Sequence, residues 1–155
     1  MLKYFTGTHD HRMDDKGRVS LPTEFRRVLD TMGVSGSLYV LPGLDDPRGL
    51  AFMTTIGYEK LLERHNVAEY PTPAAERLAE IKYITSVSQI QVDEAGRLVI
   101  TKALREEFRL EKEVRFVGLA SRFEIWRPDL REAHDAEQQA AGAKDAVSLS
   151  LRGLH

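Results

Sequence analysis

The stretch MDDKGRVSLPTEFRRVL, residues 13–29, returns in a diverged form as VDEAGRLVITKALREEF at residues 92–108. The two stretches align without a gap, at the offset of 79 residues that separates Asp14 from Asp93. Both keep an Asp-x-x-Gly-Arg motif, and both carry a second arginine further on, at Arg26 and Arg105. A repeat at a fixed offset indicates two copies of one structural unit.

Each copy predicts the same local structure. In Asp-x-x-Gly the aspartate can accept backbone N–H bonds and the glycine supplies a positive φ, which is the chemistry of a tight turn. The alternating residues 19–21 and 98–100 then predict a short strand. A helix follows, opened by Pro22 and Thr23 in the first copy and capped by Thr101 in the second.

Two further strand-like segments follow each predicted helix. They are residues 37–41 and 50–53 in the first copy, and residues 113–118 and 123–126 in the second. Because a unit of this size has little core of its own, we expect the two units to complete each other. The expected fold class is α+β, built from duplicated β-rich half-domains.

The chain is expected to divide into four segments. Residues 1–54 form the first half, and residues 91–127 form the second. Residues 55–90 are a helical connector, since residues with helical spacing flank a break at the prolines of 70–73. The polar, Ala- and Gln-rich tail, residues 128–155, is expected to be a frayed helix or disordered.

Composition narrows the class of protein. The chain of 155 residues is 42% hydrophobic and 30% charged, as expected for a soluble globular protein. It has no cysteine, which excludes disulfides and thiolate metal sites. The N-terminal residues lack the features of a signal peptide, and no apolar run approaches the ~20 residues that span a bilayer. We therefore expect a cytoplasmic protein without a membrane partner.

The repeated Asp-x-x-Gly-Arg motif is the strongest candidate for function, and it has two interpretations. It can be only a tight turn in which the arginine pairs with the aspartate. Turn geometry, however, requires the aspartate and the glycine and does not require an arginine in both copies. A guanidinium on a rigid turn suits bidentate contact with a phosphate or a guanine edge. Arg18 and Arg97 are therefore candidate nucleic-acid contacts.

The net charge of −2, from 22 basic and 24 acidic residues, is low for a nucleic-acid-binding domain. Binding depends on the local field, however, and residues 11–27 hold five Arg or Lys against three acids. Lys16 and Arg12 lie beside Arg18 in the first copy, and Lys102 follows Arg97 in the second. These five basic residues form the predicted DNA-binding set.

A metal-dependent hydrolase built on His9, His11 and Asp14 is a competing interpretation. Histidines two apart on a strand share a face, but no further ligand stands in a fixed register, so surface histidines are preferred. The sequence has neither a nucleophile elbow nor a phosphate-binding glycine loop. We expect no enzymatic activity, no metal and no cofactor.

The segments DDKGRVSLPTEFR and DEAGRLVITKALRE together resemble the MraZ family of bacterial transcription regulators, and the resemblance covers roughly residues 1–130. It implies the swapped-hairpin barrel of AbrB-like proteins, in which the two halves form a pseudo-dimer within one chain, with flanking helices. It also implies a ring-shaped homo-oligomer associated with the nucleoid. Such rings bind short direct repeats in double-stranded DNA upstream of the division and cell-wall gene cluster, commonly as repressors and in some bacteria as activators.

The same resemblance orders the predicted contacts. Arg18, with Lys16 and Arg12 beside it, is the foremost candidate, and Arg97 follows. The second motif departs from the first because Glu94 and Ala95 replace an aspartate and a lysine, which makes it less basic. A mainly structural role for Arg97 therefore stays open.

The alternative of a different class is an interaction module, either an AbrB-like antitoxin or a scaffold for another protein. An antitoxin would typically carry one such half in each chain and a toxin-binding tail. The two fused halves favour the regulator, while the tail of residues 128–155 keeps the alternative open.

Overall fold

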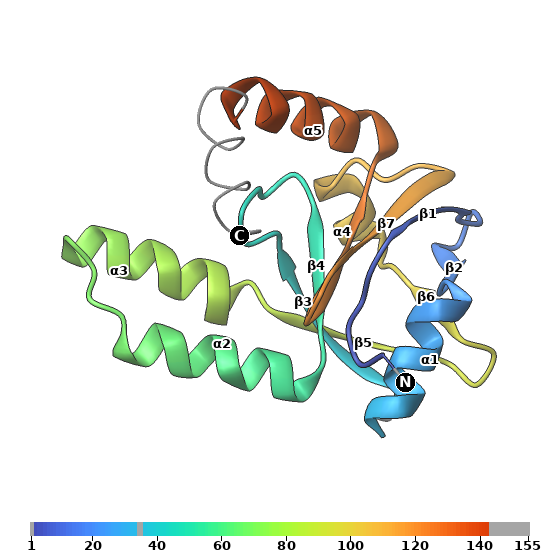
Figure 1. Cartoon of the computed structure of the whole chain (residues 1–155), viewed down its shortest axis with the longest axis horizontal. Coiled ribbons are helices and arrows are strands. Elements are labelled where there is room, and N and C mark those ends of the chain that lie inside the picture. The colour runs from blue at the N-terminus through green and yellow to red at the C-terminus, as the bar shows by residue number, and fades with distance from the viewer. Residues whose placement is uncertain (1, 34–35, 143–155) are drawn as a thin grey trace, which may run out of the picture.

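The computed structural model describes residues 2–33 and 36–142, which form an open antiparallel sheet with helices around it (Figure 1). The strands are β1 (Thr8–Arg12), β2 (Arg18–Ser20), β3 (Ser37–Pro42), β4 (Leu50–Met53), β5 (Ser88–Gln91), β6 (Arg97–Val99), β7 (Glu113–Leu119) and β8 (Arg122–Trp126). The helices are α1 (Thr23–Met32), α2 (Thr55–Val67), α3 (Pro73–Glu80), the π-helical turn η1 (Ile81–Thr85), α4 (Lys102–Glu107) and α5 (Pro128–Gly142). The predicted α+β class is confirmed.

The two halves of the repeat are interleaved. Six strands form one sheet in the order β1-β7-β8-β4-β3-β5, and β2 and β6 form a separate two-stranded ribbon, called the ribbon below. Strands of the first half pair with strands of the second at β1–β7, β4–β8 and β2–β6, always antiparallel. Neither half therefore has a complete sheet of its own.

The barrel implied by the family resemblance is not closed in this structure. The strands β1 and β5 are the two edges of the six-stranded sheet, and they are not paired with each other in the described part of the chain. The reason lies in β2 and β6, which contact these two edge strands but pair with each other in the ribbon. The sheet consequently stays open.

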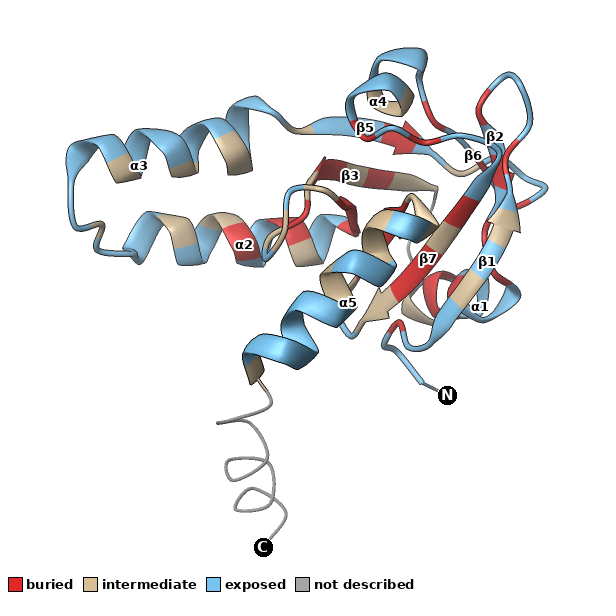
Figure 2. Cartoon of the chain, turned by 90° about the horizontal axis from the view of Figure 1, so that it is seen from above, coloured by how far each residue is buried: buried red, intermediate tan, exposed pale blue. Residues whose placement is uncertain are grey.

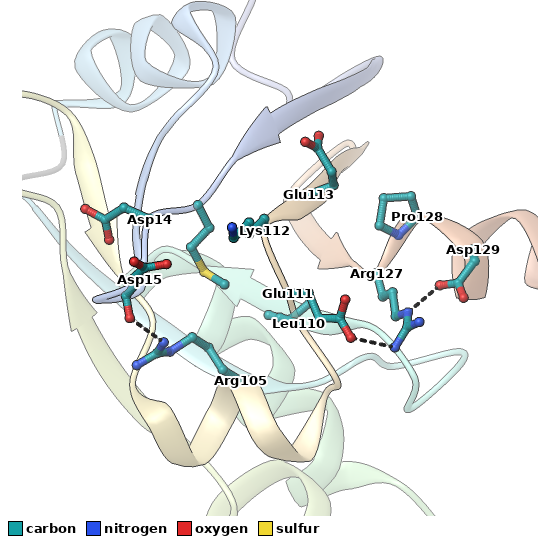
Figure 3. A pocket seen from close by; sticks show the side chains of 11 residues that line it. Asp14, Asp15, Arg105, Leu110, Glu111, Lys112, Glu113, Arg127, Pro128 and Asp129 are labelled. Atoms are coloured by element: carbon teal, nitrogen blue, oxygen red, sulfur yellow. Dashed lines mark hydrogen bonds and ion pairs between the residues drawn. The ribbon is translucent and has the colours of Figure 1, made fainter.

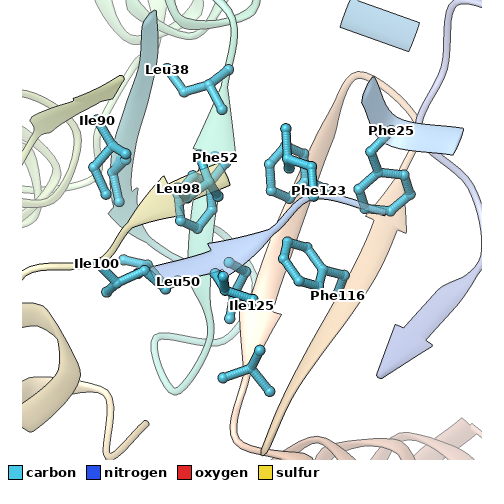
Figure 4. Close-up of a cluster of buried hydrophobic side chains, with 14 of the residues drawn as sticks. Phe25, Leu38, Leu50, Phe52, Ile90, Leu98, Ile100, Phe116, Phe123 and Ile125 are labelled. Carbon is cyan, nitrogen blue, oxygen red and sulfur yellow. The ribbon is translucent and has the colours of Figure 1, made fainter. Parts of the chain in front are cut away.

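One hydrophobic core joins the two halves (Figure 4). Phe123 of β8 stacks on Phe52 of β4 with 5.0 Å between ring centroids, and Phe25 of α1 lies 5.2 Å from Phe123 by the same measure. Burying each such ring contributes roughly 1.5–3 kcal/mol. Val19 of β2 and Leu98 of β6 belong to the same core, so the inward face of the ribbon packs against it.

The helices of the repeat begin where the sequence predicts. The helix α1 follows Pro22, and it buries Phe25, Val28 and Leu29 along one face. The helix α4 follows Thr101, whose hydroxyl accepts a hydrogen bond from the Leu104 amide at 3.3 Å. Such N-caps satisfy amide groups that have no partner inside the helix.

The connector forms a helical hairpin, α2 and α3, that projects from the body (Figures 1 and 2). Thr54 caps α2 by accepting from the Gly57 amide at 3.2 Å, and Thr72 caps α3 by accepting from the Ala75 amide at 3.1 Å. No residue of α3 is buried. None of the helices in residues 2–33 and 36–142 is long and apolar enough to cross a bilayer.

The predicted polar tail contains a helix, α5, that is held to the loop between β3 and β4. His134 Nδ1 lies 2.8 Å from Asp46 Oδ2, and Arg48 Nη2 lies 2.5 Å from Glu137 Oε2. Arg48 also pairs with Asp46, at 2.7 Å from Nη2 to Oδ2. The remainder of the tail, residues 143–155, lies outside the described residues, and the segment boundaries at 54, 90 and 127 stay predictions.

A buried polar pair lies beneath α5. Trp126 has no exposed surface, and its Nε1 donates to Glu124 Oε1 at 2.8 Å, while Glu124 is only 3% exposed. Burial raises the pKa of the Glu124 carboxyl, and the hydrogen bond from Trp126 acts in the opposite direction. The guanidinium of Arg131, on α5, lies 5.1 Å from the Trp126 ring centroid. Trp126 is thus a packing residue.

Candidate nucleic-acid interface

The ribbon places both motif arginines on one outward face. In the β2–β6 register, Arg18 is opposite Val99, and Ser20 is opposite Arg97. The central pair, Val19 and Leu98, points into the core and is 1% and 0% exposed. Because side chains alternate along a strand, the residues on either side of that pair face solvent.

Hydrogen bonds in the first turn hold both the backbone and the side chain of Arg18 in place. Asp14 Oδ1 accepts from the amides of Lys16 and Arg18, at 3.0 and 2.9 Å, and the Gly17 amide donates to the Asp14 carbonyl at 3.0 Å. Asp14 Oδ2 then lies 2.6 Å from Arg18 Nε. The amide and the guanidinium of Arg18 lower the pKa of the Asp14 carboxyl. Gly17 has a φ of +82°, which favours glycine.

The second turn repeats this geometry. Asp93 Oδ1 accepts from the amides of Ala95 and Arg97, both at 2.9 Å, and Asp93 Oδ2 lies 3.0 Å from Arg97 Nε. Gly96 has a φ of +78°. The Arg97 amide and side chain likewise lower the pKa of the Asp93 carboxyl. The two turns are therefore equivalent in structure as well as in sequence.

Both interpretations of the motif meet in these turns. The arginine does pair with the aspartate, as the purely structural interpretation requires, but the pairing uses Nε. Among the described residues, no hydrogen bond is formed by the Nη atoms of Arg18 or Arg97, and the two side chains are 43% and 44% exposed. Each guanidinium is held by one edge and offers its other N–H groups to solvent, which suits a phosphate or a base edge.

Contacts between the halves hold the two turns against the ribbon. The Ile100 amide donates to the Gly17 carbonyl at 2.8 Å, and the Leu21 amide donates to the Gly96 carbonyl at 2.9 Å. A further contact comes from Arg105 of α4, whose Nη1 donates to the Asp15 carbonyl at 3.1 Å (Figure 3).

The equivalent arginine on α1 does the same for the second turn. Arg26 Nη2 donates to the Glu94 carbonyl at 2.8 Å, and Arg26 Nη1 donates to the Ala95 carbonyl at 3.2 Å. The sequence patterns predict no contact for either residue: Arg26 contributes only to the local positive charge, and Arg105 has no predicted role. The signal in the sequence that could have identified them is that both copies of the repeat have an arginine at this position.

The other predicted contacts lie around the ribbon. Lys16 is exposed within the first turn, next to Arg18. Arg12 ends β1, with its Nε 3.7 Å from Glu113 Oε1, and Lys102 begins α4, with its Nζ 3.9 Å from Glu106 Oε1. The structure therefore brings Lys16, Arg18 and Arg97 together on the ribbon and its turns. Arg12 and Lys102 lie on adjoining elements, each near a glutamate.

An open groove of about 640 Å³ runs beside the first turn (Figure 3). Its charged side chains are of both signs, and Arg127 pairs there with Glu111 and Asp129. This lining presents no field of one sign for a charged ligand.

The histidines considered as metal ligands have other partners. His11 Nδ1 lies 2.8 Å from the Ser20 carbonyl oxygen, and His9 Nδ1 lies 3.9 Å from Glu24 Oε2. Across residues 2–33 and 36–142, no three His, Cys, Asp or Glu side chains gather as a metal site would require.

Comparison with known proteins adds an independent finding. The family model described as "MraZ protein, putative antitoxin-like" matches residues 4–81 and 84–149. A protein of Azorhizobium caulinodans named "Transcriptional regulator MraZ" is 37% identical over 156 residues, which cover 97% of this chain and 90% of that protein. Proteins of the same name from Xanthobacter autotrophicus and Pelotomaculum thermopropionicum are 36% and 32% identical. The matches cover 86% and 97% of this chain, and 83% and 97% of those proteins.

Proposed function

The chain belongs to the MraZ family, and we propose that it is a transcriptional regulator that binds specific double-stranded DNA through the ribbon. The names of its relatives support regulation and are not names of enzymes. The observation that carries the proposal is the placement of Arg18 and Arg97 on one outward face, each held by an aspartate through Nε.

The shape of the ribbon suits a nucleic acid. The major groove of B-DNA admits a two-stranded β-ribbon, and an arginine can donate two hydrogen bonds to a guanine edge. We assign Arg18 the leading contact and Arg97 a second one, with Lys16 beside them as a phosphate ligand. Arg12 and Lys102 complete the set, because exposed ion pairs as long as 3.7 and 3.9 Å contribute little and are readily exchanged for phosphate.

Self-assembly would explain how a chain with a net charge of −2 binds DNA through this site. One protomer offers a small basic surface, which gives weak affinity for screened phosphates. A ring-shaped homo-oligomer would present that surface several times to direct repeats, and the second and later contacts would be effectively intramolecular. In the proposed setting, the ring acts in the cytoplasm at the nucleoid and represses the division and cell-wall gene cluster.

The test is a salt-titrated binding measurement with DNA from upstream of the protein's own gene, against scrambled DNA of equal length. Specific affinity that rises with each added direct repeat supports the proposal. Equal affinity for native and scrambled DNA at every salt concentration overturns it. Light scattering on the same sample measures the mass of the assembly, and a monomer would remove the ring from the proposal.

A protein-interaction module is the second candidate. The observation in its favour is α3, where Leu78 is 67% exposed although surface helices usually turn their apolar face inward. The family description also contains the words "antitoxin-like". Loss of DNA preference in the titration would make a protein partner the leading candidate.

A further inference from the structure

Arg26 and Arg105 are equivalent residues of the two repeats, and each one reaches across to the other repeat. Arg26 lies on the helix of the first half and donates to carbonyls of the second turn, at Glu94 and Ala95. Arg105 lies on the helix of the second half and donates to the Asp15 carbonyl of the first turn. The contacts join residues 68 to 90 positions apart in the sequence.

These two arginines differ from the motif arginines in what their side chains do. Both Nη atoms of Arg26 are engaged by backbone carbonyls, at 3.2 and 2.8 Å. Arg105 is half-buried; its Nη1 is engaged by the Asp15 carbonyl and its Nε is buried without a hydrogen-bond partner. Arg26 therefore uses both Nη atoms, and Arg105 one Nη atom, to hold the backbone of the opposite turn, whereas the motif arginines are held through Nε and their Nη atoms form no hydrogen bond among the described residues.

The glycines of the two turns make this arrangement possible. A Cβ at Gly17 would stand 2.9 Å from Arg105 Nε, and a Cβ at Gly96 would stand 2.8 Å from Arg26 Nη1. Each arginine side chain therefore packs closely against the glycine of the turn that it contacts. The glycine serves two purposes, a positive φ and close approach of the arginine side chain.

We propose that Arg26 and Arg105 are crossed positioning residues for DNA binding: Arg105 orients Arg18, and Arg26 orients Arg97. The inference rests on the proposed function. Within each turn, the aspartate fixes the arginine relative to its own turn. The crossed contact fixes that turn relative to the opposite helix, so the motif arginine reaches DNA already ordered. Ordering a mobile side chain at an interface costs affinity, which corresponds to roughly threefold to tenfold in the dissociation constant.

The decisive experiment is a set of double-mutant cycles measured by DNA binding at low salt, where weakened variants still bind. We expect Arg105→Gln to weaken binding roughly threefold to tenfold in the full chain and in an Arg97→Ala background. It should have no further effect in an Arg18→Ala background, because its target is already absent. Arg26→Gln should show the opposite pattern, with no further effect in the Arg97→Ala background.

Two charge controls separate positioning from direct contact. Arg105→Lys and Arg26→Lys keep the charge but lack the planar fork of donors, so they should bind as weakly as the Gln variants. Lys variants that bind like the wild type would assign both residues to phosphate contact and overturn the proposal. Arg27→Gln is the matched control, because Arg27 neighbours Arg26 on α1 and its side chain makes no hydrogen bond or ion pair within the described residues. It should leave the crossed pattern unchanged.

A second readout does not depend on DNA. In Arg105→Gln, backbone amide signals of residues 15–18 should shift in nuclear magnetic resonance spectra while those of residues 94–97 stay in place, and Arg26→Gln should do the reverse. Crossed shifts in a protein that does not bind DNA would refute the proposed function. The contacts of Arg26 and Arg105 with the opposite turns would then have a structural role only. If the wild type binds DNA but Arg105→Gln and Arg26→Gln weaken binding equally in the Arg18→Ala and Arg97→Ala backgrounds, the positioning roles alone are refuted.

Discussion

Asp14 and Arg18 form a short ion pair, with 2.6 Å between the carboxylate Oδ2 and the guanidinium Nε. The same carboxylate also accepts from the Arg18 amide, so one aspartate fixes both the backbone and the side chain of one arginine. A side chain ordered before binding loses less conformational freedom when it meets a ligand. This pair therefore holds Arg18 in one orientation, as the proposed DNA contact requires.

Arg18→Ala should abolish the preference for operator DNA while the fold stays intact. We expect affinity for direct-repeat DNA to fall roughly tenfold to a hundredfold, the range for loss of one bidentate base contact. The Arg18 side chain is 43% exposed and its ion pair is at the surface, so thermal unfolding should change little. Fluorescence anisotropy with native and scrambled DNA measures both affinities.

The comparison variant for that experiment is Arg97→Ala, which removes the equivalent arginine from the less basic motif. We expect a smaller loss of affinity than for Arg18→Ala. Wild-type affinity in a folded, oligomeric Arg18→Ala protein would contradict the assignment of this residue.

Gly17→Ala should destabilise the protein by more than its backbone conformation alone explains. A Cβ there would stand 2.2 Å from the Ile100 carbonyl oxygen, in a backbone with a φ of +82°. Gly33 is the matched control, since its φ is +67° but a Cβ would meet nothing within 4 Å.

We expect Gly33→Ala to cost about 1–2 kcal/mol of unfolding free energy, and Gly17→Ala to cost more than about 3 kcal/mol. Urea denaturation followed by circular dichroism measures both. Equal losses of unfolding free energy in the two variants would show that the structure accommodates a Cβ beside the Ile100 carbonyl oxygen without cost.

Asp46→Asn should reduce stability at neutral pH and have less effect in acid. Hydrogen bonds from Arg48, and then from His134, hold the pKa of the Asp46 carboxyl well below its ordinary range. A carboxyl with a lowered pKa in the folded state contributes stability above its unfolded pKa of about 4, and loses it as the pH falls through the folded pKa.

We expect Asp46→Asn to cost roughly 1–3 kcal/mol at pH 7. The difference from the wild type should shrink as the pH falls below about 4. Urea titrations from pH 7 to pH 3 measure this, with Asp45→Asn as the more exposed neighbouring control. A constant difference across that range would show that Asp46 acts through packing and not through its charge.

Trp126→Phe should destabilise the protein more at pH 8 than at pH 5. The substitution removes the only side-chain hydrogen-bond donor that the described residues give to buried Glu124, which should cost about 1–3 kcal/mol. It also removes a contact that lowers the Glu124 pKa, so the folded-state pKa should rise further. An acid with a raised pKa loses its contribution to stability as the pH rises through that value.

Circular dichroism is the suitable probe here, because Trp126 is the only tryptophan of the chain. Glu124→Gln in the Trp126→Phe background should remove the added pH dependence. Persistence of the pH dependence in that double variant would place its origin outside Glu124.

The sequence was sufficient for the features that depend on neighbouring residues. Asp14, Gly17, Asp93 and Gly96 have the turn geometry that their spacing predicted, and the helix after Thr101 is capped as expected. The family assignment from the paired motifs is confirmed as well.

The features that the sequence did not reveal depend on pairing between distant residues. The placement of Arg18 and Arg97 on one face follows from the register of β2 with β6, and the contacts of Arg26 and Arg105 follow from the same interleaving. Local patterns do not contain that register. The barrel that the family resemblance implies is not closed in this structure, where β2 and β6 pair with each other and the edges of the six-stranded sheet are not paired within the described residues.

The interleaved strands also govern when the molecule can fold during synthesis. Arg18 leaves the ribosome 79 residues ahead of Arg97, and Asp10 leaves it 105 residues ahead of its ion-pair partner Arg115. At roughly 5–20 residues per second, β2 waits on the order of 4–16 s for β6. A chain that ends before β6 therefore lacks the second strand of the ribbon.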